Sequence, residues 1–274
     1  MPEGDTVFAA AHRLRAGLAG KPLTRSDFRV PRYATTDLSG WAVTGVRSVG
    51  KHLFIDVSAG ERTASIHSHL KMEGRWQVGQ LGSRWRRPGH TARVVLRTDD
   101  VEAVGFDLGV VDVLADPATA VAHLGPDLLG DYWDAATAVA NLARSPDTPI
   151  GVALLDQRLL AGIGNVYRSE ICFLHRARPT ARVADVDLPG IVETAHRLLW
   201  ENRLRPIRST TGVTARGREL WVYGRDRRPC RRCGTTVVRD MLGELDGQGG
   251  LDGQGGLDGQ GGRGVYFCPR CQQP

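Results

Sequence analysis

The chain has 274 residues, of which 41% are hydrophobic and 24% charged, and its formal net charge is +6. This length is enough for one large domain or two modest ones, each with its own core. No apolar run is long enough to span a bilayer, and the N-terminus lacks the apolar segment of a secretory signal. These features argue against a membrane protein, and we expect a cytoplasmic one.

The first part of the chain predicts one helix followed by many short strands. Apolar residues recur at helical spacing from Val7 to Leu18, and Gly20 ends the pattern. Over residues 21–116, short apolar or alternating runs are separated by Gly, Pro, Asp or Ser. This pattern predicts a β-rich sandwich.

Beyond residue 132 the periodicity becomes helical. Thr148 is expected to be a helix N-cap, with Pro149 at the first helical position. A further helix is expected over residues 188–202.

A tight turn followed by another helix is predicted between these two elements. Gly162 and Gly164 flank the turn. Asn165 is expected to cap a helix over residues 166–174.

Positive charge is concentrated in one segment. Residues 201–240 contain 11 arginines and 4 acidic residues, a net charge of +7, and the rest of the chain is close to neutral. Such a local surplus is expected of a surface that binds phosphates. A solvated basic loop is the alternative.

Four of the five cysteines form two C-x-x-C pairs, Cys230 with Cys233 and Cys268 with Cys271. This spacing is typical of a structural Zn²⁺ site with four thiolate ligands. A pair of redox dithiols is the alternative, but nothing around them resembles a thioredoxin βαβ unit. Cys172 lies in an apolar run, and we expect it to be a buried core thiol.

The sequence Leu-Asp-Gly-Gln-Gly-Gly occurs three times in tandem over residues 245–262. Three repeats with one apolar residue each cannot bury a core, so we interpret them as a low-complexity insert in a loop. Without the insert, 16 residues separate the cysteine pairs, which suits a two-stranded hairpin with zinc at its base. Arg263 begins the returning strand, and a rigid hairpin would present it at the tip. Taken alone, it is one exposed arginine.

The N-terminus carries a candidate nucleophile. Methionine is usually removed before a small residue such as Pro2, and this leaves a secondary amine with a reference pKa near 7.7–8.0. Such an amine can attack a sugar C1′ and form an iminium ion. Glu3 follows it and could transfer protons to or from the opening sugar.

These motifs occur together in one order along the chain. They are Pro2-Glu3-Gly4, Gly50-Lys51-His52-Leu53, the run Leu-Ala-Gly-Ile-Gly-Asn-Val-Tyr-Arg-Ser-Glu at 160–170, and the four cysteines. The combination closely resembles the formamidopyrimidine-DNA glycosylase/endonuclease VIII family over essentially the whole chain. The glycine-rich run resembles the family's helix–two-turn–helix element.

The resemblance implies an α+β fold in three domains. Residues 1–125 would form an N-terminal β-sandwich catalytic domain with a leading helix. Residues 132–225 would form the helix–two-turn–helix DNA-binding domain, and residues 226–274 a zinc-finger β-hairpin that contains the insert. The resemblance further implies a bacterial, nucleoid-associated monomer that binds damaged DNA. It would have no membrane partner and no nucleotide cofactor.

The resemblance also implies roles for individual residues. Pro2 would be the Schiff-base nucleophile and Glu3 its acid/base partner. Lys51 matches the lysine that contacts phosphate and assists β-elimination, and Arg263 matches the finger arginine associated with δ-elimination. Deleting the insert is expected to leave cleavage intact, provided that it bulges away from the last strand.

DNA contacts are implied at two further positions. Asn165, with the backbone amides of its helix N-terminus, would bind a phosphate beside the lesion. His123 aligns with a further DNA-contacting position.

The loop at residues 69–74 is expected to enter the DNA when the damaged base is flipped out. Met72 is the candidate apolar wedge, with Lys71 beside it. A core position for Met72 is the alternative. Glu73 stands where endonuclease VIII often has an aromatic residue, and Met72 itself resembles the formamidopyrimidine branch.

The opening Pro2-Glu3-Gly4-Asp5 resembles endonuclease VIII, whereas the other branch usually continues Pro-Glu with Leu-Pro. Residues 208–221 also leave little room for a long loop that caps an oxidised purine. We therefore expect a bifunctional glycosylase/lyase that acts on oxidised pyrimidines. The same chemistry on oxidised purines, a non-catalytic zinc protein that binds DNA damage, and an RNA-binding zinc protein are the alternatives.

Overall fold

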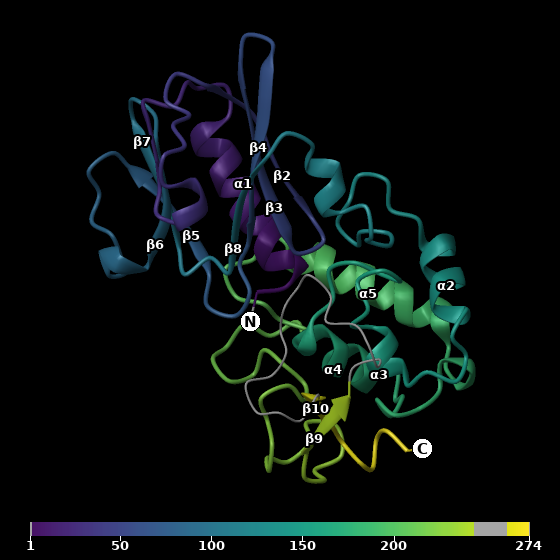
Figure 1. Cartoon of the computed structure of the whole chain (residues 1–274). Helices are drawn as coiled ribbons and strands as arrows, with labels where there is room; N and C mark the ends of the chain where they lie inside the picture. Colours follow the sequence, from purple (N-terminus) through teal and green to yellow (C-terminus); the bar gives the residue numbers. More distant parts are fainter. Residues whose placement is uncertain (1, 244–261, 274) are drawn as a thin grey trace. The chain divides into compact units, whose positions relative to one another are not determined.

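The computed structural model describes residues 2–243 and 262–273. By its internal contacts the chain divides into two units, Pro2–Ala122 and His123–Pro274 (Figure 1). The three domains expected from the sequence are a finer division, and they stay a prediction.

The first unit consists of helix α1 (Gly4–Leu18) and two four-stranded antiparallel sheets. Their strand orders are β2-β3-β4-β8 and β1-β6-β7-β5. The strands are β1 (Arg25–Phe28), β2 (Ala42–Val49), β3 (His52–Ala59), β4 (Arg62–His69), β5 (Arg75–Gln80), β6 (Ala92–Arg97), β7 (Val101–Phe106) and β8 (Val110–Leu114). Short 3-10 helices η1 (Pro31–Tyr33), η2 (Gly89–Thr91) and η3 (Pro117–Ala120) lie in the connections.

The core of this unit lies between α1 and the inner faces of the sheets. In β3, Leu53, Ile55 and Val57 alternate with residues of the outer face, and they share one buried cluster with Val7 and Leu14 of α1. A period of two is expected of a strand with one face in a core. The predicted β-sandwich with a leading helix is confirmed.

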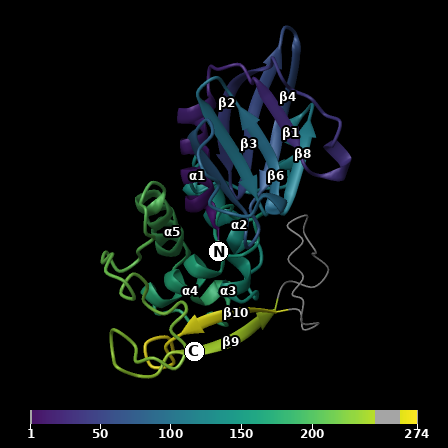
Figure 2. The ribbon, with the colours of Figure 1, turned by 90° about the vertical axis from the view of Figure 1, so that its left-hand side faces the viewer.

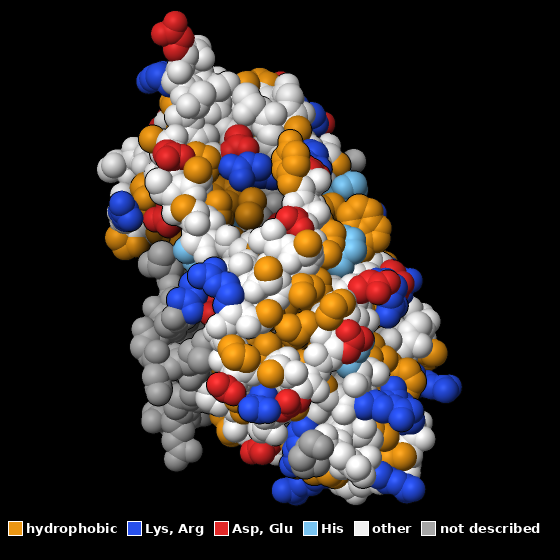
Figure 3. All heavy atoms as spheres, turned by 90° about the vertical axis from the view of Figure 1, so that its right-hand side faces the viewer, with side chains coloured by type: hydrophobic (Ala, Val, Ile, Leu, Met, Phe, Trp, Pro, Cys, Tyr) orange, Lys and Arg blue, Asp and Glu red, His pale blue; other side chains and the backbone are white. Residues whose placement is uncertain are grey.

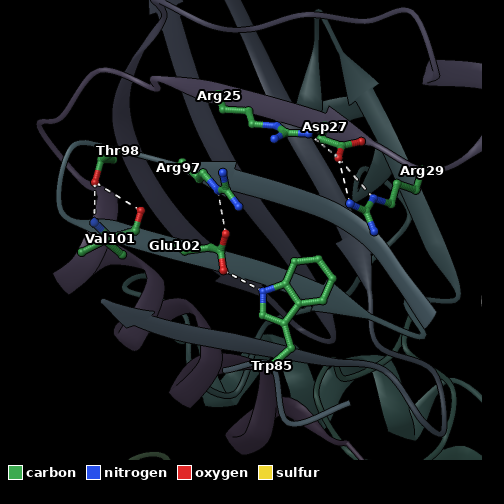
Figure 4. Close-up of polar contacts among 8 residues, drawn as sticks. All are labelled: Arg25, Asp27, Arg29, Trp85, Arg97, Thr98, Val101 and Glu102. Carbon is green, nitrogen blue, oxygen red and sulfur yellow. Dashed lines mark hydrogen bonds and ion pairs between the residues drawn. The ribbon is translucent and has the colours of Figure 1, made fainter. Parts of the chain in front are cut away.

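The connection between β5 and β6 is held on the outer face of its sheet by Trp85 (Figure 4). The indole packs edge-on against Phe106 with ring centroids 5.7 Å apart, and its Nε1 donates to Glu102 at 2.7 Å. Arg97 Nε donates to the other oxygen of Glu102 at 2.6 Å. Because this buried carboxylate has a donor for each oxygen, the network is a structural one.

In its described residues, the second unit contains four α-helices and a hairpin. They are α2 (Ala135–Ala143), α3 (Ile150–Ala153), α4 (Asn165–Leu174), α5 (Leu188–Asn202), β9 (Val238–Gly243) and β10 (Gly262–Phe267), with the 3-10 helix η4 (Val183–Asp185) before α5. Asp134 and Asp187 cap α2 and α5 by accepting from the amides of Thr137 and Gly190. Figure 2 shows the antiparallel β9–β10 pair beside α3 and α4. The predicted helix over 188–202 and the predicted hairpin are confirmed.

The expected helix start at Thr148 is wrong. Pro149 occupies the N-cap position, and α3 begins one residue later, at Ile150. The carbonyl of Thr148 accepts from the amide of Val183, and Pro149 forms a β-bridge with Arg182. The backbone is therefore extended here.

The expected cap of α4 is also one residue out of place. Gly164 is the N-cap, and Asn165 is the first helical residue. Gly162, which precedes the helix, has a φ of 115°, so this turn requires glycine.

Among the described residues, no helix is long and apolar enough to cross a membrane.

Candidate active site

The N-terminal motif lies at the start of α1. Glu3 is the N-cap residue, with extended backbone, and its carbonyl accepts from the amides of Thr6 and Val7 at 2.9 and 3.1 Å. The Glu3 side chain is fully buried, whereas Pro2 is partly exposed. Removal of Met1, as expected from the sequence, would place a terminal amine beside this buried carboxylate, an arrangement that suits proton transfer over a short distance.

Lys51 lies in the tight turn between β2 and β3. Gly50 and Lys51 form this turn between the paired residues Val49 and His52. Gly50 has a φ of 56°, which matches the first position of a type II′ hairpin turn. The turn projects Lys51 from the end of the sheet.

The start of α1 and this turn lie at the same end of the first unit. Nε of Arg15 donates to the carbonyl of Val46 at 2.7 Å, and the amide of Gly20 donates to Val43 at 2.8 Å, so α1 and β2 run side by side in opposite directions. Gly4 lies eleven helical residues before Arg15, and Lys51 lies five strand residues after Val46. Each of these two segments is about 16 Å long, so both reach the same end of the unit from the Arg15–Val46 contact. In Figure 1 the N-terminus is marked at this end, opposite the β3–β4 hairpin.

The loop between β4 and β5 leaves the sheet at that end too, because His52 pairs with His69. Lys71 has a φ of 51°, and its amide donates to Nδ1 of His69 at 3.0 Å. Gly109 lies against the side chain of Lys71, since a Cβ added at Gly109 would be only 2.1 Å from Cγ of Lys71. A larger residue at position 109 would therefore force the side chain of Lys71 to move.

Met72 is 49% exposed, so the alternative of a core position is wrong. Within residues 2–122, the exposed large hydrophobic side chains are Met72 and Leu81. Leu81 follows β5 at the opposite end of its strand, and Glu73 is exposed beside Met72. The end that carries Pro2, Glu3 and Lys51 therefore also carries an accessible apolar side chain.

A group of buried histidines behind this loop was missed by the sequence reasoning. Nδ1 of His52 and Nε2 of His67 lie 2.9 Å apart with stacked rings, and the ring of His69 meets that of His52 edge-on. His67 Nδ1 is 3.5 Å from a carboxylate oxygen of Asp112. Burial lowers the pKa of His67, and Asp112 opposes this shift. The available signal in the sequence was the spacing of His67 and His69, which stand at alternate positions of one strand. This strand pairs with the strand that follows Lys51.

In the second unit, the helix–two-turn–helix element consists of α3, two turns and α4. Asn165 is buried at the start of α4, and its Oδ1 has no hydrogen-bond partner among the described residues. The amides of the first helical turn point out of the same helix end. Polar groups of this kind can bind an anion. His123 is exposed in a turn at the start of this unit.

Glu170 of α4 is a second residue that the sequence reasoning did not single out. It is fully buried, and its oxygens accept from the hydroxyl of Thr210 and from the amides of Trp221, Val222 and Tyr223. Burial raises the pKa of Glu170, and these four donors oppose the rise. The carboxylate joins α4 to the segment that leads into the cysteine module.

The four cysteines Cys230, Cys233, Cys268 and Cys271 have Sγ atoms that all lie within 4.8 Å of one another. The Cys230–Cys271 and Cys233–Cys268 pairs are 3.9 and 3.5 Å apart. Four sulfurs about 2.3 Å from one tetrahedral zinc would be about 3.8 Å apart, so the residues fit this ion. Burial and the neighbouring thiols raise the pKa of Cys271 to about 12, an effect that a bound dication would offset. The predicted structural zinc site is confirmed, and the predicted core position of Cys172 is confirmed by its full burial.

Arg263 is the second residue of β10 and pairs with Leu242 of β9. Its side chain is partly buried. Gly262, the last residue of the repeat, belongs to β10, so the insert ends one residue earlier than the sequence suggested. The remaining residues of the insert lie outside the described part of the chain. Figure 3 shows Lys and Arg side chains distributed over one face of the molecule, with Asp and Glu side chains among them.

Two family models match the chain. The N-terminal domain of formamidopyrimidine-DNA glycosylase matches residues 1–112, and its H2TH domain matches residues 124–201. The chain belongs to the formamidopyrimidine-DNA glycosylase/endonuclease VIII family. The expected resemblance is therefore confirmed.

Similar proteins indicate the branch of this family. The DNA-(apurinic or apyrimidinic site) lyase Nei2 of Mycolicibacterium smegmatis is 51% identical over 99% of both chains. A probable endonuclease 8 2 of Streptomyces coelicolor is 50% identical over 99% of this chain and 94% of its own length. These relatives confirm the endonuclease VIII branch and, with it, the enzyme class of DNA glycosylase and lyase.

A solved structure supports the fold. The formamidopyrimidine-DNA glycosylase of Lactococcus lactis, bound to DNA that contains an AP site, superposes with a TM-score of 0.75 over 100% of both chains. Its sequence identity is 21%. The match confirms the predicted fold class of sandwich, helix–two-turn–helix domain and C-terminal hairpin.

Proposed function

We propose that this protein excises oxidised pyrimidines from DNA and then cleaves the strand on both sides of the abasic sugar. The observation that carries the proposal is the common location of the α1 start, the Lys51 turn and the Met72 loop at one end of the first unit. A nucleophilic amine, a buried carboxylate, a cation and an apolar wedge there match the needs of base excision.

In the first step, the nitrogen of Pro2 attacks C1′ of the damaged nucleotide. The C1′–N bond to the base breaks, and the base leaves with the bonding electrons and takes up a proton. Glu3 protonates O4′ as the sugar ring opens, which leaves an iminium ion between Pro2 and C1′. The secondary amine is suited to this step because it forms a cationic iminium directly.

The iminium then withdraws electrons from the sugar and makes two eliminations possible. Loss of the C2′ proton expels the 3′ phosphate by breaking C3′–O3′, and loss of the C4′ proton expels the 5′ phosphate by breaking C5′–O5′. Lys51 is assigned to the phosphate during β-elimination and Arg263 to the phosphate that leaves in δ-elimination. Water finally hydrolyses the iminium and frees Pro2.

Base flipping requires a group that fills the vacated stack. Unstacking costs a few kcal/mol, least at a damaged pair, and Met72 supplies the apolar wedge. Lys71, whose side chain has room beside Gly109, contacts the DNA next to this wedge. Asn165 binds a phosphate beside the lesion, and His123 contacts the DNA at a further position.

The preference for pyrimidines rests on the segment between α5 and the finger. The amides of Thr210 and Thr211 donate to the carbonyl of Glu219 at 2.9 and 3.2 Å, and Ser209 Oγ donates to Val213 at 2.8 Å. These bonds close the segment into a short loop. A short loop offers little surface to cover a bicyclic base, which favours the smaller one.

The test is excision from matched duplexes that carry 5-hydroxyuracil or 8-oxoguanine, with a preformed abasic site as the reference. The proposal predicts faster release of the pyrimidine and a 3′-phosphate end on the upstream fragment. Faster release of 8-oxoguanine would favour the same chemistry on purines. Tight binding to all three without cleavage would indicate a damage-binding protein and refute the enzymatic proposal.

A further inference from the structure

The hairpin that carries Arg263 is held on α4 by a buried arginine. Arg168 is fully buried, and its Nη2 donates to the carbonyls of Arg263 and Gly264 at 3.2 and 3.1 Å. Its Nη1 donates to the carbonyl of Gly151 in α3 at 3.3 Å. A guanidinium stays charged in a protein interior, so its N–H groups must find acceptors there. The backbone of β10 supplies two of them, the carbonyl of Arg263 itself and that of the next residue, Gly264.

A second contact follows on the next residue of α4. Ser169 Oγ accepts from the amide of Tyr266 at 3.3 Å and donates to the carbonyl of Asn165 at 2.9 Å. Two consecutive helical residues, Arg168 and Ser169, therefore hold the strand at two points. This fixes the position of β10 along α4 as well as its distance from it.

The strand opposite Arg263 is held as well. Leu242, the partner of Arg263 in the hairpin, lies against Gly151: a Cβ there would be 2.8 Å from Cδ2 of Leu242. Leu242 and Arg263, the second pair from the open end of this ladder, thus lie against α3 and α4. The length of the segment that joins them need not affect the position of Arg263.

We propose that Arg168 is the positioning residue for Arg263, and that it keeps Arg263 in place for δ-elimination. The inference rests on the proposed function, in which Arg263 acts on the leaving 5′ phosphate. Arg168 touches neither DNA nor the reacting sugar in this scheme. Its effect is on the backbone from which Arg263 extends.

The chemistry predicts a selective defect when Arg168 is changed. β-Elimination uses Pro2 and Lys51 of the first unit, so it should be preserved. δ-Elimination depends on the position of one cation, and a displacement near 1 Å can reduce a rate by about 100-fold. Without Arg168, the product of β-elimination should therefore accumulate.

The experiment uses the full-length protein and a 5′-labelled oligonucleotide with a preformed abasic site, on which the two products separate by gel. Arg168→Met retains the aliphatic chain and removes the donors. We expect β-elimination within about threefold of the wild-type rate and δ-elimination at least about tenfold slower. Arg168→Lys retains one charged donor group and should restore part of the δ product.

Arg225 provides the matched control. It also holds backbone carbonyls, donating to Trp221 and Pro229 at 2.6 and 2.8 Å, but neither bond involves β10. Arg225→Met should leave the ratio of β to δ products unchanged. An equal shift in this variant would mean that any loosening of the finger slows δ-elimination, and it would overturn the positioning role.

A double-mutant cycle separates this inference from the proposed function. In an Arg263→Ala background, Arg168→Met should cause no further loss of δ product, because the group that it positions is gone. If Arg263→Ala alone leaves the δ product unchanged, the proposed role of Arg263 fails, and the inference fails with it. If Arg263→Ala removes the δ product but Arg168→Met does not reduce it, only the positioning role is overturned. Should Arg168→Met not fold, Ser169→Ala applies the same test through Tyr266 and should show the same but smaller shift.

Discussion

Replacement of Glu170 by glutamine is expected to loosen the segment that leads into the finger. Oε2 of Glu170 accepts from the amide of Trp221 at 2.7 Å and from the hydroxyl of Thr210, and Oε1 accepts from the amides of Val222 and Tyr223, both at 2.8 Å. Glutamine has one oxygen where glutamate has two. Its amide nitrogen cannot accept a hydrogen bond.

The magnitude follows from the number of amides that lose an acceptor. With the new nitrogen at the Oε1 position, two buried N–H groups would be unpaired. At the Oε2 position only the amide of Trp221 is unpaired, because the hydroxyl of Thr210 can turn and accept, so glutamine should adopt this orientation. One buried unpaired donor costs about 1–3 kcal/mol, which corresponds to about 5- to 150-fold in an opening equilibrium.

The assay is amide hydrogen exchange of the peptide that contains residues 221–223, measured under conditions in which exchange reports local opening. Glu170→Gln should speed exchange there by this factor and leave the peptides of the first unit unchanged. Glu219→Gln is the control, because Glu219 contributes its carbonyl, not its carboxylate, to the bonds of this loop. Unchanged exchange in Glu170→Gln would refute the role given to the carboxylate.

Three further predictions concern the insert, the histidine group and the wedge. Replacing residues 244–261 by Asn-Gly, a two-residue turn between the paired residues Gly243 and Gly262, should leave strand cleavage within about twofold of wild type; a selective loss of δ product would contradict this. Burial lowers the pKa of His67 in the folded protein, so this histidine is protonated in the unfolded chain before it is protonated in the folded one as the pH falls below about 6.5. The free energy of unfolding should therefore decrease as the pH falls through this range. The free energy of unfolding, measured with urea, should decrease less between pH 7 and pH 5.5 in His67→Gln than in wild type or in the exposed control His90→Gln. Equal decreases in the three proteins would contradict this role of His67. Met72→Ala should slow excision from duplex DNA at least about tenfold without slowing cleavage of an abasic site in a single strand. Leu81→Ala, which alters the other exposed large hydrophobic residue of this unit, should change neither rate.

The sequence predicted those parts of the fold that depend on local patterns. Helical spacing identified α1 and α5, and the C-x-x-C pairs identified the zinc site because their ligands are close in sequence. The start of α3 was misplaced because tertiary bonds to residues 182–183 extend the backbone at Thr148. Local capping preferences carry no information about such a partner.

The site residues that sequence reasoning missed act through distant partners. Arg168 and Glu170 lie inside the glycine-rich motif, but the partners that join them to the finger segment and the hairpin are 40–96 residues away. His67 and His52 meet because β3 and β4 pair in one register. A single sequence predicts the strands but not the register that brings these rings together.

The central claim is that the amine of Pro2 forms the covalent bond to the sugar. The most direct measurement is borohydride reduction of the protein with DNA that contains 5-hydroxyuracil, followed by proteolysis and mass spectrometry of the trapped peptide. The account predicts an adduct on a peptide that begins at Pro2, and no adduct when an uncleaved residue precedes Pro2. An adduct on Lys51, or cleavage that persists with the N-terminus blocked, would contradict it.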